Sequence, residues 1–195
     1  MEHEIKETIR EEKVKKKISV QHMVLVGMFT AVLAVMSQLS IPLPSGVPMT
    51  LQVFAVTLVG LLLGWKLGVI TVLIYILVGA SGAPVFANFK GGLGAITGFS
   101  GGFLWGFIFL ALFSGLAVKL SNRVLGFMVV IAGILLCYLC GFVQFSILSG
   151  TSFGEVVKTM TVLYLPKDVV SVVAAYIVER YMSRILRKVS VYNNL

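Results

Sequence analysis

The stretch "VLGFMVVIAGILLCYLCGFVQFSILS", residues 124–149, contains no charged residue and no proline. A helix of about 20 apolar residues crosses the hydrocarbon core of a bilayer, which is about 30 Å thick. This stretch is therefore long enough and apolar enough to span a membrane. It predicts an integral membrane protein.

Five further apolar runs lie outside this stretch, at approximately 20–40, 50–64, 67–81, 99–120 and 166–186. The second and third of the six are the shortest, and the tight turn "LGWKLG" joins them. The pattern predicts an all-α integral membrane protein, a bundle of six transmembrane helices. The bundle is expected over residues 19–187, between a charged N-terminal segment at 1–18 and a tail at 188–195.

The composition excludes an ordinary soluble domain. Hydrophobic residues make up 58% of the chain and charged residues 12%, against about 25% charged in a typical soluble domain. Most basic residues lie next to apolar runs and are not gathered on one soluble face, so no nucleic-acid partner is expected. The first run has no small-residue cleavage site and is longer than the core of a signal peptide, which predicts that it persists as the first spanning helix.

The basic residues predict that both termini are cytoplasmic, because Lys and Arg concentrate on the cytoplasmic side of membrane proteins. With the N-terminus inside, three basic residues fall outside, namely Lys90, Lys158 and Lys167. The other basic residues fall inside, namely Lys6, Arg10, Lys13, Lys15, Lys16, Lys17, Lys66, Lys119, Arg123, Arg180, Arg184, Arg187 and Lys188. This orientation brings "IPLPSGVPMTLQ" (41–52), a glycine-rich segment (82–103) and "LYLPKD" (163–168) to the outer side.

Helix boundaries are signalled by caps and prolines. Ser19 is a plausible N-cap of the first helix, and the proline-rich loop that follows ends it. Ser152 and Glu155 have capping-box spacing, which predicts a short helix outside the sixth span. Pro166 followed by Asp168 predicts a separate start for the sixth helix, with proline in the first turn and an acid at the positive end of the dipole.

The glycine-rich segment "GAPVFANFKGGLGAITGFSGGF", residues 82–103, has a single charge, Lys90. Non-helical backbone at membrane depth is tolerated where protein or a polar cavity satisfies its hydrogen bonds. Before Gly94 no helical period is evident, and exposed glycine backbone beside Phe86 and Asn88 predicts a loop that lines a site for a small, partly apolar ligand. The alternative is a plain connector.

From Gly98 onward, glycines recur every four residues and predict close helix packing through Gly102 and Gly106. Gly27 and Ala31 likewise put two small residues four apart on the first helix, where a helix of this chain or of another subunit could approach.

Few polar residues lie in or near the spans. Asp168 is a functional candidate because an ionisable group in a span is unfavourable, and its helix-start role is compatible with that. Gln52 could bond a ligand or a neighbouring helix. Cys137 and Cys140 are expected to be packing residues, since no second pair or histidine completes a metal site. No catalytic constellation, phosphate-binding loop, metal site or cofactor is predicted.

Three segments together resemble a known family: "VPMTLQVFAVTLVGLLLGWKLG" from Val47, "GAPVFANFKGGLGAITGFSGGFLWGF" from Gly82 and "LPKDVV" from Leu165. In this order, on six predicted spans, they resemble BioY, the biotin-specific substrate-binding (S) component of energy-coupling factor (ECF) transporters. The resemblance covers nearly the whole chain. It implies the ECF S-component fold in the cell membrane of a prokaryote, capturing biotin from outside and delivering it with a transmembrane coupling subunit and two ATP-binding-cassette ATPases.

The resemblance also implies roles for residues. Gly27 and Ala31 would contact the coupling subunit, and Lys90 or Lys167 would meet the biotin carboxylate. Asp168, Asn88 and exposed glycine backbone would satisfy the ureido group. The full implied biotin-binding set is Gln52, Phe86, Asn88, Lys90, Gly91, Gly92, Tyr164 and Asp168.

The sequence departs from the family at three positions near the implied site. Ser171 stands where family members commonly carry Lys three residues after the acid, Lys167 stands where they carry Gly, and Phe103 replaces a Tyr. Two other interpretations stay open. One is an S component for another vitamin, such as thiamine or riboflavin, and the other is a self-associating membrane scaffold or channel that uses the glycine stripe. A membrane enzyme is a weaker third.

Overall fold

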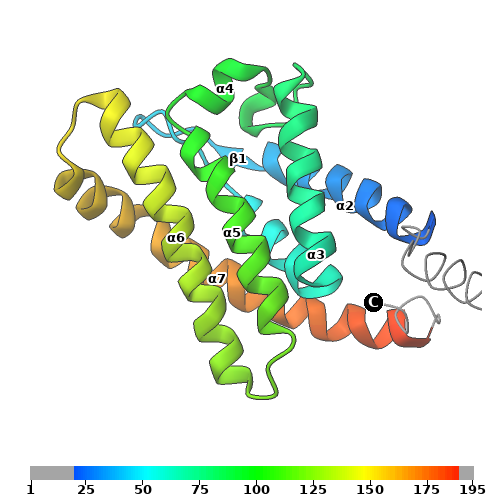
Figure 1. Ribbon diagram of the computed structural model, residues 1–195. Coiled ribbons are helices and arrows are strands. Elements are labelled where there is room, and N and C mark those ends of the chain that lie inside the picture. Colours follow the sequence, from blue (N-terminus) through cyan, green and yellow to red (C-terminus); the bar gives the residue numbers. More distant parts are fainter. Residues whose placement is uncertain (1–19, 189–195) are drawn as a thin grey trace, which may run out of the picture.

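A computed structural model describes residues 20–188 of the chain, and nearly all of this part is helical (Figure 1). The predicted segment 1–18, the cap Ser19 and the tail after residue 188 lie outside the described residues. The helices are α2 (Val20–Gln38), α3 (Gln52–Ala80), α4 (Leu93–Thr97), α5 (Gly101–Ala117), α6 (Arg123–Ser149) and α7 (Phe153–Lys188), with a 3₁₀ turn η1 (Ala87–Phe89). Four of them, α2, α3, α6 and α7, are long and apolar enough to cross a membrane, and α5 is shorter.

The proline-rich loop is not entirely irregular. Its two ends form the strands β1 (Ser40–Ile41) and β2 (Met49–Thr50), which pair antiparallel with Ser40 opposite Thr50. This small ribbon is an addition to the predicted all-α fold. It holds the loop together at the end of α2, and it delivers the chain directly into α3.

The element α3 contains two apolar segments that fold back on each other, as the "LGWKLG" motif predicts. Gly64 breaks the helix with φ 72° and ψ 175°, a conformation that favours glycine. A Cβ atom added to Gly68 would lie 3.1 Å from the Cα of Gly60, whereas eight residues of straight helix would separate them by about 12 Å. The predicted turn between the second and third apolar runs is therefore confirmed.

Helix α5 lies between α3 and α6 and packs extensively against both (Figure 1). The close approach to α6 depends on two glycines. A Cβ atom on Gly106 would lie 2.6 Å from the Cα of Cys137, and one on Gly102 would collide with the carbonyl oxygen of Cys140. The predicted packing role is thus confirmed for Gly102 and Gly106, while Gly98 precedes the helix.

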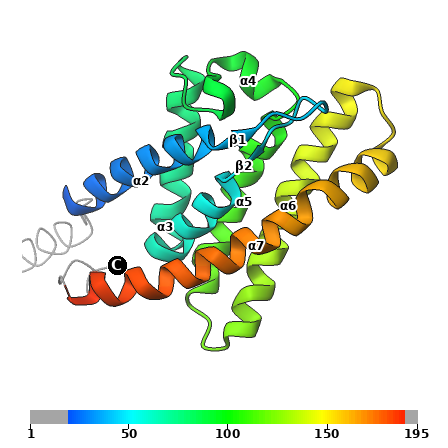
Figure 2. The same ribbon diagram turned by 180° about the vertical axis from the view of Figure 1, so that it is seen from behind.

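Helix α7 crosses the bundle diagonally in one piece (Figure 2). A helix does begin after Ser152, as the capping spacing predicts, but it continues through Pro166 to Lys188. The predicted separate helix start at Pro166 is therefore wrong. Proline removes one backbone hydrogen bond from the ladder, and the packing of α7 along α3 compensates for that loss.

Candidate functional site

A cavity lies where the three unusual segments of the sequence converge. We call it the inner cavity. Its walls come from β2 and the loop before it, the start of α3, the loop at 82–92, the first turns of α5, and the middle of α6 and α7. The lining residues are Val47, Pro48, Thr50, Gln52, Val53, Phe86, Ala87, Lys90, Ala95, Ser100, Phe103, Leu104, Phe107, Tyr138, Tyr164, Lys167 and Asp168. Most are apolar or aromatic, and the polar ones are Thr50, Gln52, Lys90, Ser100, Lys167 and Asp168.

The most buried charge in this cavity is Asp168, which is 2% exposed. The Tyr138 hydroxyl donates a 2.6 Å hydrogen bond to Asp168 Oδ2, and Lys167 Nζ forms an ion pair with Oδ1. The Lys167 ammonium also donates to the carbonyl oxygen of Thr50 at 2.9 Å. A carboxylate offers about four acceptor positions. Asp168 therefore keeps acceptor capacity for the N–H groups of a ligand, while Lys167 compensates its charge.

An aromatic wall stands beside this carboxylate. The ring of Phe103 lies 6.4 Å from that of Tyr138, edge to face, and 6.5 Å from that of Tyr164. The Tyr164 hydroxyl donates to the carbonyl oxygen of Val47 at 2.6 Å, which fixes the proline-rich loop over α7. The inner cavity thus pairs a flat apolar surface with a hydrogen-bonded carboxylate, which suits a small ligand that is partly apolar and carries N–H donors.

Gln52 connects the inner cavity to the loop at 82–92, which we call the glycine loop. Its side-chain oxygen accepts from the Thr50 hydroxyl at 2.9 Å, and its nitrogen donates to the Tyr75 hydroxyl at 2.8 Å. The Tyr75 hydroxyl donates in turn to the carbonyl oxygen of Val85 at 3.0 Å. Gln52 therefore bonds a neighbouring helical segment, one of its two predicted roles, and it also lines the cavity.

The glycine loop is fastened to the end of α2 by Ser37 and Gln38. The Ser37 hydroxyl donates to the Val85 carbonyl oxygen at 2.5 Å. The Gln38 amide donates to the carbonyl oxygen of Phe86 at 3.1 Å and accepts from the backbone N–H of Phe89 at 2.9 Å. Because Phe86 forms a cavity wall, these hydrogen bonds connect the end of α2 to the inner cavity through the glycine loop.

The structure brings five of the predicted site residues to the inner cavity, namely Gln52, Phe86, Lys90, Tyr164 and Asp168. It does not bring Asn88, Gly91 or Gly92 there. Asn88 and Phe89 have left-handed backbones with φ 58° and 54°, and the exposed Asn88 amide accepts from the Ser40 hydroxyl at 2.8 Å. The Gly92 N–H donates to the Gly79 carbonyl oxygen at 2.7 Å, which ties the glycine loop to α3.

An outer hollow of about 380 Å³ adjoins the inner cavity, whose own volume is about 50 Å³. Lys90, Ala95 and Ser100 line both spaces, whereas Gly91 lines the outer hollow but not the inner cavity. Sites for small organic ligands typically measure about 300–1,000 Å³. A ligand of that class therefore needs the walls of the inner cavity to move apart. The wall next to the outer hollow is formed by the end of the glycine loop, α4 and the turn before α5.

Sequence reasoning missed Ser37, Gln38, Tyr75 and Tyr138 as parts of this site, and it noted Phe103 only as a departure from the family. Ser37 and Gln38 close the first apolar run with two polar residues, which was an available signal for a contact at the membrane edge. The two tyrosines are embedded in apolar runs, where aromatic side chains are typical of helix packing. Nothing in the local pattern distinguishes them.

Comparison with known proteins gives a consistent picture. Residues 10–188 match the sequence model of the BioY family. A probable biotin transporter BioY of Pyrococcus horikoshii is 34% identical over 154 residues, which cover 79% of this chain and 91% of that protein. The biotin transporter BioY of Thermotoga maritima is 50% identical over 93 residues, which cover 48% of this chain and 54% of that protein.

A solved structure shares the fold. It is the S-component for biotin from an ECF-type ABC transporter, which superposes with a TM-score of 0.76 at 23% identity. The superposition covers 87% of this chain and 94% of that chain. The overall helical fold is thus shared with that protein. Together with the family match and four helices long and apolar enough to cross a membrane, it is that of a multi-pass membrane protein.

Proposed function

The chain belongs to the BioY family, and from this premise we propose that it is the biotin-binding S component of an ECF transporter. Its relatives in Pyrococcus horikoshii and Thermotoga maritima carry the name biotin transporter. The observation that carries the proposal is the buried carboxylate of Asp168, hydrogen-bonded to Tyr138 and facing an aromatic wall. The inner cavity is the proposed biotin site.

The chemistry of biotin suits this cavity. Its ureido group carries two N–H donors and one carbonyl acceptor, and its sulfur-containing ring is apolar. Asp168 has acceptor capacity for the two donors, and the remaining N–H of the Lys167 ammonium would face the carbonyl. The apolar ring would stack on Phe103 and Tyr164.

The carboxylate of biotin needs a cation or backbone donors. Ser171 occupies the position where relatives commonly carry lysine, and Ser171 does not line the inner cavity. Lys167 does, one residue before the acid, and Lys90 lies where the inner cavity meets the outer hollow. Since Lys167 is engaged with Asp168 and Thr50, we assign the carboxylate to Lys90, with the tail of biotin directed toward the outer hollow.

The proposed topology has six spans, with the two segments of α3 counted separately, and both termini in the cytoplasm. It rests on the distribution of Lys and Arg between the two ends of the bundle. Energy would come from partner ATPases through a coupling subunit. Gly27 and Ala31 support this contact, because both are exposed on α2 and no atom lies within 4 Å of a Cβ added to Gly27.

Neither alternative function gains support from the packing. Gly102 and Gly106 are covered by α6 of the same chain, so this part of the glycine stripe is not available to a second copy, as a scaffold would need. An S component for another vitamin would share the fold and differ in the cavity. The inner cavity has a carboxylate compensated by Lys167 and an aromatic wall, which favour a neutral heterocycle with N–H donors.

The proposal is tested by a ligand panel on the purified full-length protein in detergent. Calorimetric titrations with biotin, thiamine and riboflavin should show binding for biotin alone, by a monomeric protein. Binding of thiamine or riboflavin with no biotin binding would replace the proposed ligand. An oligomer that binds none of the three would favour the scaffold.

A further inference from the structure

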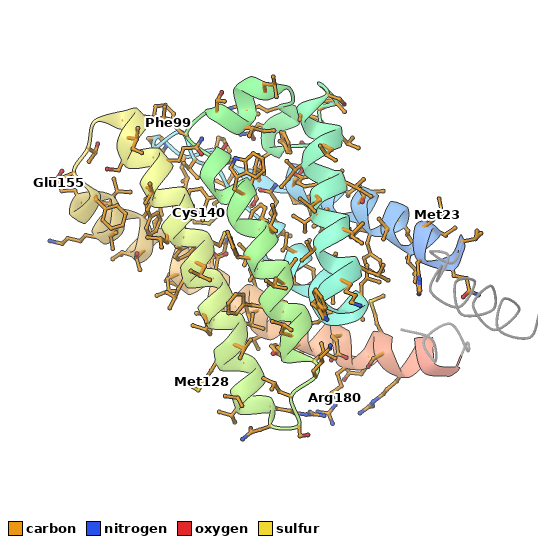
Figure 3. All side chains as sticks on the ribbon, viewed as in Figure 1. Met23, Phe99, Met128, Cys140, Glu155 and Arg180 are labelled. Atoms are coloured by element: carbon orange, nitrogen blue, oxygen red, sulfur yellow. The ribbon has the colours of Figure 1, made fainter. Side chains whose placement is uncertain are left out.

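A second site is present at the end of the bundle away from the inner cavity. It is a hollow of about 500 Å³, bounded by the end of α5, the turn at 118–122, the start of α6 and one face of α7. Figure 3 places Arg180, a lining residue, at the end of the molecule opposite Phe99, which lines the outer hollow. We call this second site the far hollow.

The far hollow is lined by two cations from different helices, Arg123 at the start of α6 and Arg180 on α7. Glu179 is the one carboxylate among its lining residues. Within residues 20–188 no carboxylate lies within 4.0 Å of either guanidinium group. The two arginines are therefore charge-complementary to an anion that enters the hollow from outside, and guanidinium groups bind phosphate oxygens in a bidentate manner.

A hydroxyl group in the wall also lacks a partner. The Tyr176 hydroxyl is buried and makes no hydrogen bond among the described residues, although its ring packs 6.1 Å from that of Phe127. A Cβ atom on Gly126 would lie 3.5 Å from this hydroxyl, so the glycine leaves the space beside it open. Buried hydroxyls without partners are uncommon in folded proteins. This one can donate to an acceptor that occupies the hollow.

The rim of the far hollow is apolar and exposed. Val118, Val173 and Ile177 line the hollow and are 45%, 44% and 53% exposed, and Val124 and Leu125 beside Arg123 are 69% and 48% exposed. Val118, Val124 and Leu125 lie at the ends of α5 and α6, and Val173 and Ile177 lie on α7, in a multi-pass membrane protein. The far hollow thus joins an anion-binding floor to an apolar rim that acyl chains can cover.

We propose that the far hollow binds the headgroup of an anionic phospholipid, with its phosphate between Arg123 and Arg180 and hydrogen-bonded by Tyr176. Basic pockets between transmembrane helices are known to hold such headgroups. A free phosphate ion would share the cationic floor but would leave the apolar rim uncovered. The proposal does not depend on the identity of the ligand in the inner cavity.

The test compares lipids on the full-length protein in mixed micelles. Native mass spectrometry should show retention of phosphatidylglycerol in preference to phosphatidylcholine, and the double variant Arg123→Gln/Arg180→Gln should lose at least tenfold in apparent affinity. The matched control is Lys66→Gln/Lys119→Gln. It removes the same charge from two lysines that lie over the Trp65 ring and are not among the lining residues of the far hollow, and it should bind phosphatidylglycerol like the wild type.

A milder variant tests the site with less risk that unfolding causes the loss of binding. Tyr176→Phe keeps the ring and both arginines, and it should weaken phosphatidylglycerol binding severalfold with an unchanged helical circular dichroism spectrum. An equal loss of phosphatidylglycerol affinity in the lysine control would show that general charge attraction explains the effect, and it would contradict the proposed site. Competition by millimolar inorganic phosphate as strong as that by the lipid would overturn the lipid assignment, as would unchanged binding in the arginine variant.

Discussion

The Tyr138 hydroxyl on α6 lies 2.6 Å from the Asp168 carboxylate on α7, and both residues line the inner cavity. This hydrogen bond joins two helices that otherwise make limited contact, and it orients the acid toward the space beside Phe103. In the proposed function, it positions the acceptor that recognises the ureido group. Tyr138 is thus a positioning residue as well as a wall of the site.

Tyr138→Phe removes this donor and keeps the ring. A hydrogen bond to a charged group contributes about 1.5–3 kcal/mol, so biotin affinity should fall at least about tenfold. Isothermal titration calorimetry measures the change, with Tyr181→Phe, an exposed tyrosine of α7, as the control. Unchanged affinity in Tyr138→Phe would show that the orientation of Asp168 does not depend on this bond.

The two lysines of the site should have different roles, Lys167 in thermal stability and Lys90 in biotin binding. Lys167→Met leaves Asp168 buried without its ion pair. The thermal midpoint should fall by about 10 °C, because the loss of one partner of a buried ion pair costs about 3–5 kcal/mol and each kcal/mol shifts the midpoint by about 2–4 °C. Lys90→Met should leave the midpoint unchanged and weaken biotin binding.

Biotin amide lacks the carboxylate charge, so a comparison of biotin with biotin amide identifies the lysine that binds the carboxylate. Wild-type protein should prefer biotin to the amide, and Lys90→Met should lose that preference in competition binding. If Lys167→Met loses the preference and Lys90→Met retains it, the carboxylate assignment moves to Lys167.

Gln38 should control how quickly ligand leaves. Gln38→Leu removes one bond to Phe86 and one from Phe89, so the glycine loop should open more readily and the biotin dissociation rate should rise about tenfold. Stopped-flow chase experiments measure this rate, and the association rate should change little. The control is Asn88→Gly, which removes the exposed contact with Ser40 and retains the left-handed backbone. A similar acceleration in both variants would rule out a specific fastening role for Gln38.

The exposed small residues of α2 predict a separation of binding from transport. Gly27→Trp has open space around the new side chain, so fold and biotin affinity should match the wild type. Co-purification with the coupling subunit and biotin uptake by cells should both be lost. Gly27→Ala is the control and should preserve both. Normal uptake by Gly27→Trp would place the coupling contact elsewhere.

Sequence reasoning reached the apolar segments and the acid, but not the links between them. The six apolar runs and the turn at Gly64 follow from local composition, and Asp168 stands out as a carboxylate in an apolar helix. By contrast, Lys167 meets Thr50 across 117 positions and Gln38 meets Phe86 across 48. No local period encodes such contacts, because they arise only when α2, the glycine loop and α7 converge.

One error and one unexpected position have physical causes that lie beyond local rules. Pro166 was expected to start a helix, yet α7 continues through the proline and packs along α3. Asn88 was expected to line the site. Its left-handed backbone brings its amide to Ser40 outside the inner cavity, and its role in ligand binding stays a prediction. A left-handed backbone conformation cannot be predicted from the sequence of a segment without a regular period.

The central claim is that Asp168 recognises biotin in the inner cavity, and calorimetric titration of biotin into Asp168→Asn tests it most directly. The variant keeps the shape of the side chain and removes its charge, so affinity should fall at least about a hundredfold as charge-assisted bonds of about 1.5–3 kcal/mol each are lost. Glu155→Gln, which neutralises an exposed acid on the same helix, should bind as the wild type does. A folded Asp168→Asn protein with wild-type affinity for biotin would contradict the account.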